Sequence, residues 1–299
     1  MLVYENEAKS VKCDSAGVKK LDNGIINFAM KITQINIFPV KSMRGLSVPE
    51  TVIEDRGPRF DRRWMIVDAS GCFLTQREIP AMATIAVAAD DDGIRFESNG
   101  SVHISKIGSM SDSVAVEIWN DRTTALGGDH AADSWLSAEL GRDCRLVYMP
   151  VSARRMVDPE YAVDERDVVS FADAYPYHLI GEASLEELNR RLENPVPMNR
   201  FRPNFVVEGS TAFAEDGWRR IRIGEVEFHV VKPCARCVIP SIDQDSGERG
   251  SVEPTRTLAS FRTFERNGAK KVLFGQNLIA ASGGGKVSVG DAVEVLEFV

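Results

Sequence analysis

The chain has 299 residues, of which 36 are lysine or arginine and 44 are aspartate or glutamate, giving a formal net charge of -8. Its hydrophobic share of 43% excludes collagen-like and disordered chains, and its length suggests two domains. Nucleic acids and anionic membranes bind proteins that carry positive charge, so neither is an expected partner of this acidic chain. Any anion that it binds must be held by a local basic cluster.

The first half of the chain is predicted to be rich in strands. Residues 1–30 are polar and aperiodic, which predicts a weakly structured extension. Residues 31–40 alternate apolar and polar side chains, as strands do. Hairpins are expected over 64–76 and over 94–105, the latter turning at Asn99-Gly100. Strand-like residues 113–126, a helix over 130–140 and a strand over 145–150 complete a predicted strand-rich domain spanning residues 31–150.

The second half begins after a polar segment, 151–168, that predicts a linker or long loop. A helix capped by Ser184 is expected over 182–194. Strands are expected over 205–209, 219–233 with a turn at Gly224, and 237–243. A short helix over 255–264 precedes strands over 272–281, 286–291 and 292–298. Since no βαβ rhythm occurs, we predict a mainly β chain with a few helices (α+β), folded as barrels or sandwiches, whose second domain covers residues 169–299.

Five cysteines are unevenly spread, which favours a reducing compartment over a disulfide framework. The chain shows no signal peptide and no apolar run long enough for a membrane helix, so we expect a cytoplasmic protein without membrane attachment. Cys234 and Cys237 form a close pair that is open to three interpretations: buried structural thiols, one thiolate metal ligand, or zinc or redox use. Arg236 lies between them and would favour a thiolate.

Basic residues recur at turns beside glycine and proline. Lys41-Ser42, Arg62, Arg77 and the Arg202-Pro203-Asn204 segment are of this kind. Ammonium, guanidinium, hydroxyl and backbone N–H groups together bind phosphate, so the set suggests an anionic cofactor. The competing interpretation is a series of ordinary solvated surface residues. The same choice applies to the aspartates that crowd the middle segment, Asp158, Asp164, Asp167 and Asp173.

Several segments together resemble one family. They are FPVKSMRGLSV, FDRRWMIVDASGCFLTQREIP, EASLEELNRRL, RFRPNFVV, KPCARCVIPSIDQDSG and the final LFGQN and SGGGKVSVGDAVEVL. In this order they are similar to the MOSC-domain proteins that carry an N-terminal MOSC β-barrel domain, the group of the mitochondrial amidoxime-reducing component and its bacterial counterparts. The resemblance covers roughly residues 31–299 and implies an N-terminal β-barrel-like domain over 31–150 and a MOSC β-barrel domain over 169–299.

The resemblance implies a molybdenum cofactor of the molybdopterin type and a two-electron reduction of N-hydroxylated small molecules. By position in the Pro-Cys-x-Arg-Cys motif, Cys237 would be the metal ligand and Cys234 a neighbour. Lys41, Ser42 and Arg62 match residues that hold the phosphate end of the cofactor. The remaining matches are Arg202 and Asn204 near the pterin, Arg236 beside the ligand, Asp173 as an acidic group close to the metal, and Arg77, Gln76 and Gln276 as weaker pocket candidates.

Two further expectations follow from the resemblance. Some bacterial members carry a ferredoxin-like [2Fe–2S] domain, for which this chain has no cysteine cluster, so a separate electron donor is implied, either a ferredoxin or a flavin/iron–sulfur reductase. The alternative function is a non-catalytic carrier of the cofactor or a sulfur-handling module, because MOSC domains also terminate cofactor sulfurases.

Overall fold

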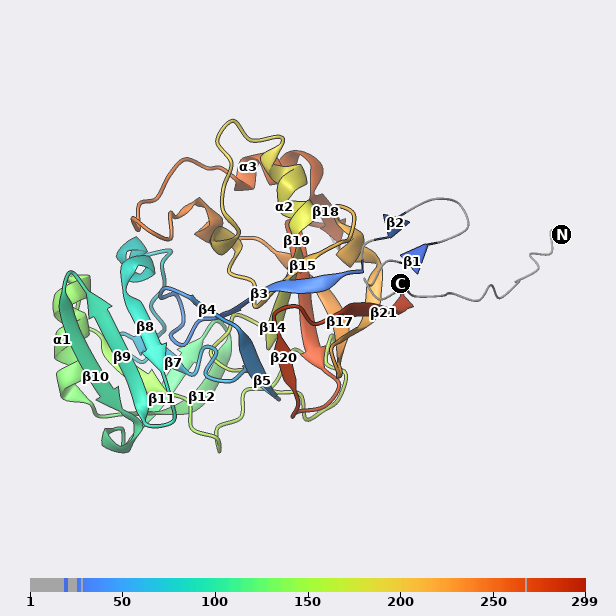
Figure 1. Cartoon of the computed structure of the whole chain (residues 1–299). Helices are drawn as coiled ribbons and strands as arrows, with labels where there is room; N and C mark the ends of the chain where they lie inside the picture. Colours follow the sequence, from blue (N-terminus) through green and yellow to red (C-terminus); the bar gives the residue numbers. More distant parts are fainter. Residues whose placement is uncertain (1–18, 21–25, 28, 267) are drawn as a thin grey trace.

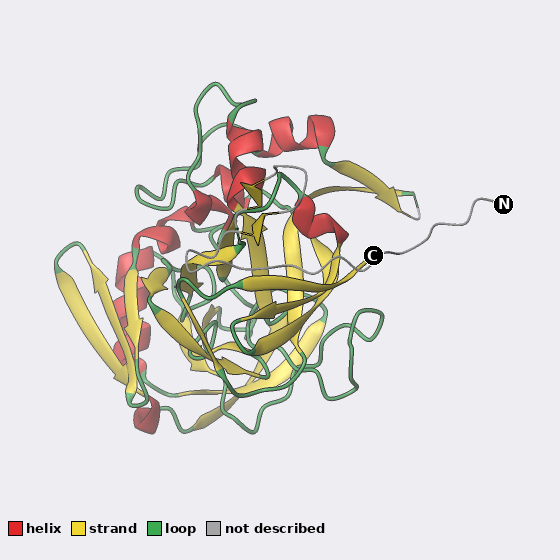
Figure 2. Cartoon of the chain, turned by 45° about the vertical axis from the view of Figure 1, so that its right-hand side comes forward, coloured by secondary structure: helices red, strands yellow, loops and turns green. Residues whose placement is uncertain are grey.

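The computed structural model describes residues 19–20, 26–27, 29–266 and 268–299, so most of the predicted extension over 1–30 lies outside the described residues. Strands dominate the described part, with three α-helices at its periphery (Figure 2), and the mainly β prediction is confirmed. Within the described residues, no helix has both the length and the apolar character that crossing a membrane requires.

Two small sheets and a helix gather at one end of the molecule (Figure 1). Their elements are β7 (Trp64–Val67), β8 (Ala86–Ala89), β9 (Gly93–Ser98), β10 (Ser101–Lys106), β11 (Asp112–Ile118), β12 (Asp121–Gly127), α1 (His130–Leu140) and β13 (Arg145–Tyr148). One sheet has the order β10-β9-β8 and the other β11-β12-β13-β7. Asn99 and Gly100 join β9 to β10, both at positive φ as a tight hairpin turn requires, and the helix over 130–140 is confirmed.

A larger sheet contains most strands of the second half. They are β14 (Tyr177–Gly181), β15 (Phe205–Glu208), β16 (Trp218–Ile223), β17 (Val226–Ala235), β18 (Thr263–Arg266), β19 (Ala269–Ala280) and β21 (Val293–Phe298). The order is β21-β16-β17-β19-β14-β15-β3-β4, with β18 beside β19. Strands β3 (Lys31–Ile37) and β4 (Leu46–Val48) thus come from the first half, and β3 pairs antiparallel with β15.

A second connection between the halves comes from a small sheet of order β20-β5-β6. It consists of β20 (Lys286–Ser288), β5 (Glu50–Glu54) and β6 (Gly57–Pro58), while β1 (Lys19–Lys20) pairs with β2 (Ile26–Asn27). The main core packs between these sheets, where the rings of Tyr177, Phe205 and Phe228 lie 5.3–5.8 Å apart. Helices α2 (Glu182–Asn189) and α3 (Thr255–Phe261) cover a further apolar cluster that includes Leu188, Leu258 and Phe274.

No helix or strand lies between β13 and β14, a stretch that includes residues 151–168, and the domain boundaries placed there stay a prediction. Two local predictions are wrong. The strand expected over 237–243 is instead a 3-10 helix at Ile239–Ser241, because Pro240 cannot donate to a strand ladder and the Ser241 hydroxyl closes the turn on the Val238 carbonyl at 2.7 Å. The second arm of the hairpin over 64–76 contains only isolated bridges.

A third local prediction is also wrong, because Ser184 does not cap α2. The N-cap is Gly181, and Ser184 lies fully buried inside the first turn. Its hydroxyl donates to the carboxylate of Glu215 at 2.7 Å and accepts the backbone N–H of Phe213 at 2.8 Å. The serine therefore ties α2 to the buried Glu215 rather than to its own helix end.

We expect Ser184→Ala to lower the free energy of unfolding by about 2 kcal/mol, since buried donors and acceptors lose their partner. Urea unfolding followed by circular dichroism measures this change. Ser260→Ala is the matched control, because Ser260 also lies on a helix but is exposed and bonds only the Thr257 carbonyl. Equal losses in the two variants would contradict the importance of the Glu215 contact.

Candidate functional site

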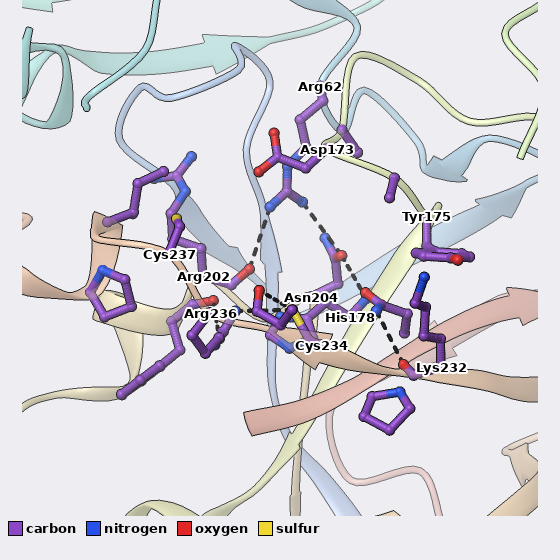
Figure 3. Close-up of a pocket in the computed structure, with 18 of the residues that line it drawn as sticks. Arg62, Asp173, Tyr175, His178, Arg202, Asn204, Lys232, Cys234, Arg236 and Cys237 are labelled. Atoms are coloured by element: carbon purple, nitrogen blue, oxygen red, sulfur yellow. Dashed lines mark hydrogen bonds between the residues drawn. The ribbon is translucent and has the colours of Figure 1, made fainter. Parts of the chain in front are cut away.

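A cavity of about 260 Å³ opens where the turns of the first half meet β14, β15 and the end of β17 (Figure 3). All eight site residues predicted from the sequence line it, namely Lys41, Ser42, Arg62, Asp173, Arg202, Asn204, Arg236 and Cys237. The fold thus brings together residues from both halves of the chain. What each of them binds stays a prediction.

The charge of this cavity is opposite to that of the whole chain. Its basic lining residues are Lys41, Arg62, Arg200, Arg202, Lys232, Arg236 and Lys271, and its acidic lining residue is Asp173. The chain as a whole has a formal net charge of -8. Such a local concentration of cations in an acidic protein is suited to an anionic ligand.

A fully buried carboxylate, that of Asp61, holds one wall of the cavity. It accepts hydrogen bonds from the Phe38 N–H (2.8 Å), Arg62 Nη1 (2.6 Å) and Asn204 Nδ2 (3.1 Å). Burial raises the pKa of Asp61, and the bonds from Arg62 and Phe38 oppose that rise. The Asn204 amide oxygen also accepts the His178 N–H at 3.1 Å, so Arg62 and Asn204 are fixed by the same network (Figure 3).

Arg202 lies on the same wall and is buried with an unsatisfied donor. Its guanidinium stacks 4.2 Å from the Phe38 ring and donates Nη1 to Gln244 at 3.2 Å. Among the described residues, Arg202 Nη2 and Arg236 Nε are buried without a hydrogen-bond partner. Burial, followed by repulsion from Arg62, lowers the pKa of Arg202 to about 9. Unpaired buried donors of this kind are costly, and a ligand rich in acceptor atoms would satisfy them.

Lys41 and Asp173 form an ion pair beside the thiol of Cys237. The Lys41 ammonium lies 2.6 Å from Asp173 Oδ1 and donates to the Phe171 carbonyl at 2.8 Å. Burial lowers the pKa of Lys41 to about 8, against the opposing charge of Asp173. Burial alone would raise the pKa of Asp173, but Lys41 and Arg77 hold it well below its usual range, so this carboxyl stays ionised.

The two cysteines of the pair have different surroundings. Cys237 is exposed, and its Sγ accepts Arg77 Nη2 at 3.5 Å. Cys234 is half-buried, and Arg236 donates to its Sγ at 3.2 Å, so the intervening arginine faces Cys234. Burial raises the pKa of the Cys234 thiol. In the described chain, no three His, Cys, Asp or Glu side chains are placed to hold a metal ion, which leaves the zinc interpretation without a ligand set.

None of the three weaker candidates lines the cavity, but Gln76 and Arg77 donate hydrogen bonds to residues that do. Gln76 is buried, donates to the Ser42 carbonyl at 2.8 Å and exchanges hydrogen bonds with Gln244. Gln276 donates to Asp216 at 2.7 Å. Arg77 reaches Cys237 and Asp173, as given above.

Sequence reasoning missed several lining residues, namely Ala172, Ala174, Tyr175, His178, Arg200, Lys232, Lys271 and Asn277. Tyr175 and Lys232 lie away from Cys237 in Figure 3, and the Lys232 ammonium lies 5.8 Å from the Tyr175 ring centre. Lys232 lies directly before the Pro-Cys-x-Arg-Cys motif, and from this position it could have been predicted as a lining residue. His178 and Asn277 sit inside apolar strand patterns and carry no such signal.

The mainly β fold agrees with the two domain families that match this sequence, one of which is described as a beta barrel. The MOSC N-terminal beta barrel domain matches residues 29–143, and the MOSC domain matches residues 166–294. The chain therefore belongs to the family of MOSC-domain proteins with an N-terminal MOSC β-barrel domain.

Its relatives include mitochondrial amidoxime-reducing component 1 of Mus musculus, 32% identical over 284 residues, which are 89% of this chain and 82% of the mouse protein. The Homo sapiens protein of that name is 30% identical over 280 residues, again 89% of this chain and 82% of the relative. The molybdenum cofactor sulfurase of Oryza sativa subsp. japonica is 32% identical over 265 residues, which are 82% of this chain but 32% of the sulfurase.

Asp173→Asn tests the ion pair through its pH dependence. Below about pH 8 the buried Lys41 is protonated and needs its counter-charge, whereas above that pH it is neutral in the folded protein. We therefore expect the variant to lower the melting temperature more at about pH 6.5 than at about pH 9, by roughly twofold. Thermal melts by circular dichroism at the two pH values measure the difference.

The control for that experiment is Asp245→Asn, because the Asp245 carboxylate pairs with Arg44 at 3.0 Å but both side chains are exposed. An exposed pair contributes little, so its loss should be small at both pH values. If Asp173→Asn showed no pH dependence, the Lys41–Asp173 assignment would be wrong.

Proposed function

We propose that the protein is a molybdenum-cofactor-dependent oxidoreductase that reduces N-hydroxylated small molecules, such as amidoximes, hydroxylamines or N-hydroxylated bases. The observation that carries this proposal is the exposed Cys237 thiol at the edge of a cavity whose buried guanidinium groups include unpaired donors. A cofactor that brings its own sulfur ligands needs only one further thiolate from the protein, and soft thiolates suit such metals.

The lining residues fit the proposed cofactor. Lys41, Ser42 and Arg62 would hold its phosphate, since ammonium, hydroxyl and guanidinium groups are the usual phosphate donors. Arg202 and Asn204 would contact the pterin, and the unpaired Nη2 of Arg202 is available for one of its acceptors. Arg236 is held by Cys234 and by the Phe201 carbonyl at 2.9 Å, which leaves its Nε for the ligand.

When bound to Cys237, the cofactor would supply a metal that exchanges two electrons and accepts an oxygen atom. Reduction of an N–O bond consumes two electrons and two protons and releases water, R–NH–OH + 2 H⁺ + 2 e⁻ → R–NH₂ + H₂O. Because Asp173 stays ionised, it orients groups rather than supplying a proton. Lys41, with a pKa lowered to about 8, is protonated close to neutral pH, which suits its proposed role in binding the phosphate.

The proposal includes a separate electron-donor protein, either a ferredoxin or a flavin/iron–sulfur reductase, and a reducing compartment such as the cytoplasm. Support for the compartment comes from Cys72, Cys144, Cys234 and Cys237, all of which are free thiols. The match to one third of a cofactor sulfurase favours the second candidate, a cofactor carrier or sulfur-handling module. The two functions differ in whether the cofactor-loaded chain, when it is supplied with electrons, reduces an N-hydroxylated substrate.

Purified protein from a host that makes the cofactor is expected to contain about one molybdenum per chain, because one thiolate site is available. Cys237→Ala should lose activity on benzamidoxime by about three orders of magnitude or more, since the metal loses its protein ligand. Elemental analysis and benzamidine formation with reduced methyl viologen as donor are the measurements. Cys72→Ala, which removes another exposed free thiol, is the control and should behave as wild type.

The outcomes separate the two candidate functions. Molybdenum together with benzamidine formation supports the reductase, and molybdenum without turnover supports the carrier. Both candidate functions would be wrong if the purified protein contained no molybdenum while another molybdenum enzyme made in the same host was active.

Arg202→Met should lower the molybdenum content by roughly tenfold while the fold persists, because it removes the buried donor that the cofactor would satisfy. Elemental analysis after gel filtration measures the retained metal. The matched control is Arg222→Met on β16, whose exposed guanidinium pairs with glutamates on the sheet surface. Full retention of the metal in Arg202→Met would contradict a role for Arg202 in holding the cofactor.

A further inference from the structure

Arg77 connects the Cys237 site to a residue that has no contact with the cavity. Its guanidinium donates to Asp173 Oδ2 at 3.0 Å and to Cys237 Sγ at 3.5 Å. The same guanidinium stacks 4.7 Å from the ring centre of Trp119, the first residue of the turn between β11 and β12. The Arg77 guanidinium therefore contacts the indole face of Trp119 and the Cys237 sulfur at the same time.

Trp119 occupies its turn at a cost in free energy. Its φ of 56° lies in the left-handed region, where asparagine and glycine are favoured and bulky residues are strained. Its side chain is also 47% exposed, although it is one of the largest apolar groups of the chain. A strained backbone conformation persists only where the surrounding structure stabilises it. The conformation of Trp119 therefore indicates that the contacts of its side chain offset this strain.

The position of the indole is itself defined by Phe73, whose ring packs edge-on at 5.0 Å and 61°. The Lys41 ammonium lies 5.2 Å from the centre of the same Phe73 ring. The two rings thus lie beside both cations that pair with Asp173. Trp119 is half exposed and is not itself a member of the core cluster on which Phe73 packs, so besides its contact with Phe73 its main interaction is the stacking on Arg77.

We propose that Trp119 is a positioning residue of the Cys237 site, which confines the Arg77 guanidinium against the Cys237 sulfur and the Asp173 carboxylate. An arginine side chain has considerable rotamer freedom, and stacking on an indole removes most of it. A hydrogen bond to a ligating sulfur tunes the metal that the sulfur binds, so the position of Arg77 would affect the electronic state of the centre. The effect on the metal rests on the proposed function, because it requires the cofactor to bind at Cys237. The confinement of Arg77 by Trp119 does not require a bound cofactor.

The test compares Trp119→Ala, Trp119→Phe, Arg77→Gln and the double variant Trp119→Ala/Arg77→Gln. We expect Trp119→Ala to leave the molybdenum content unchanged, to shift the Mo(V) electron paramagnetic resonance signal and to lower kcat by about tenfold with KM nearly constant. Trp119→Phe should restore most of the activity, because a phenyl ring still stacks on a guanidinium. The double variant should be no worse than Arg77→Gln, since both changes act through one group.

A second readout uses the metal-free protein. The ¹H–¹⁵N resonance of Arg77 Nε, assigned with Arg77→Lys, should show restricted motion in wild type and lose that restriction in Trp119→Ala. Phe264→Ala is the matched control, because Phe264 is also 47% exposed and stacks on Arg262 at 5.2 Å, with no contact to the cavity. It should leave every readout unchanged.

The outcomes keep this inference apart from the proposed function. Absence of molybdenum in the wild type overturns the function, while the resonance of Arg77 still decides the inference. Additive losses in the double variant, an unchanged electron paramagnetic resonance signal, or an Arg77 side chain equally restricted in Trp119→Ala would overturn the role of Trp119.

Discussion

The buried carboxylate of Asp61 joins segments that lie far apart along the chain, and the cavity depends on it. Its three donors come from the turn after β3, from Arg62 and from Asn204, which in turn binds the Asn36 carbonyl and the His178 N–H. A buried charge is tolerated only when it is paired and fully hydrogen-bonded. The residues that satisfy Asp61 are thereby placed on the cavity wall, so the stability of this contact and the geometry of the site have the same origin.

The cavity combines this rigid wall with cations that are only partly compensated. Asp61 balances Arg62, and Asp173 balances Lys41 and Arg77, but Arg202 is buried with an unpaired nitrogen and a pKa lowered to about 9. Such an arrangement is less favourable without an anion than with one. A ligand that binds only the folded state adds its binding free energy to stability. The same uncompensated cations that repel one another inside the site therefore favour the binding of an anionic cofactor.

Sequence patterns predicted the features that are local. The Asn99-Gly100 turn, the helix over 130–140 and the turn at Gly224 each depend on residues that are neighbours in the chain. The 3-10 helix at Ile239–Ser241 and the buried contact of Ser184 with Glu215 were not predicted, because Pro240 overrides an apolar pattern and Glu215 is distant in sequence. The basic turns were visible individually, but only the resemblance to a family indicated that they converge. His178 and Tyr175 were missed because their placement depends on strands that pair across the fold.

The place of β3 in the larger sheet has a consequence for how the chain folds during synthesis. β3 pairs with β15, and β5 pairs with β20 near the end of the chain, so strands made first must wait for partners made last. Loops closed over such separations slow folding and leave strand edges exposed in the meantime. A ribosome-bound chain that ends before residue 205 has β4 but not β15 to pair with β3, and one that ends before 286 has β6 but not β20 to pair with β5. One edge of β3 and one edge of β5 therefore stay unpaired in the nascent chain until the later strands have been synthesised.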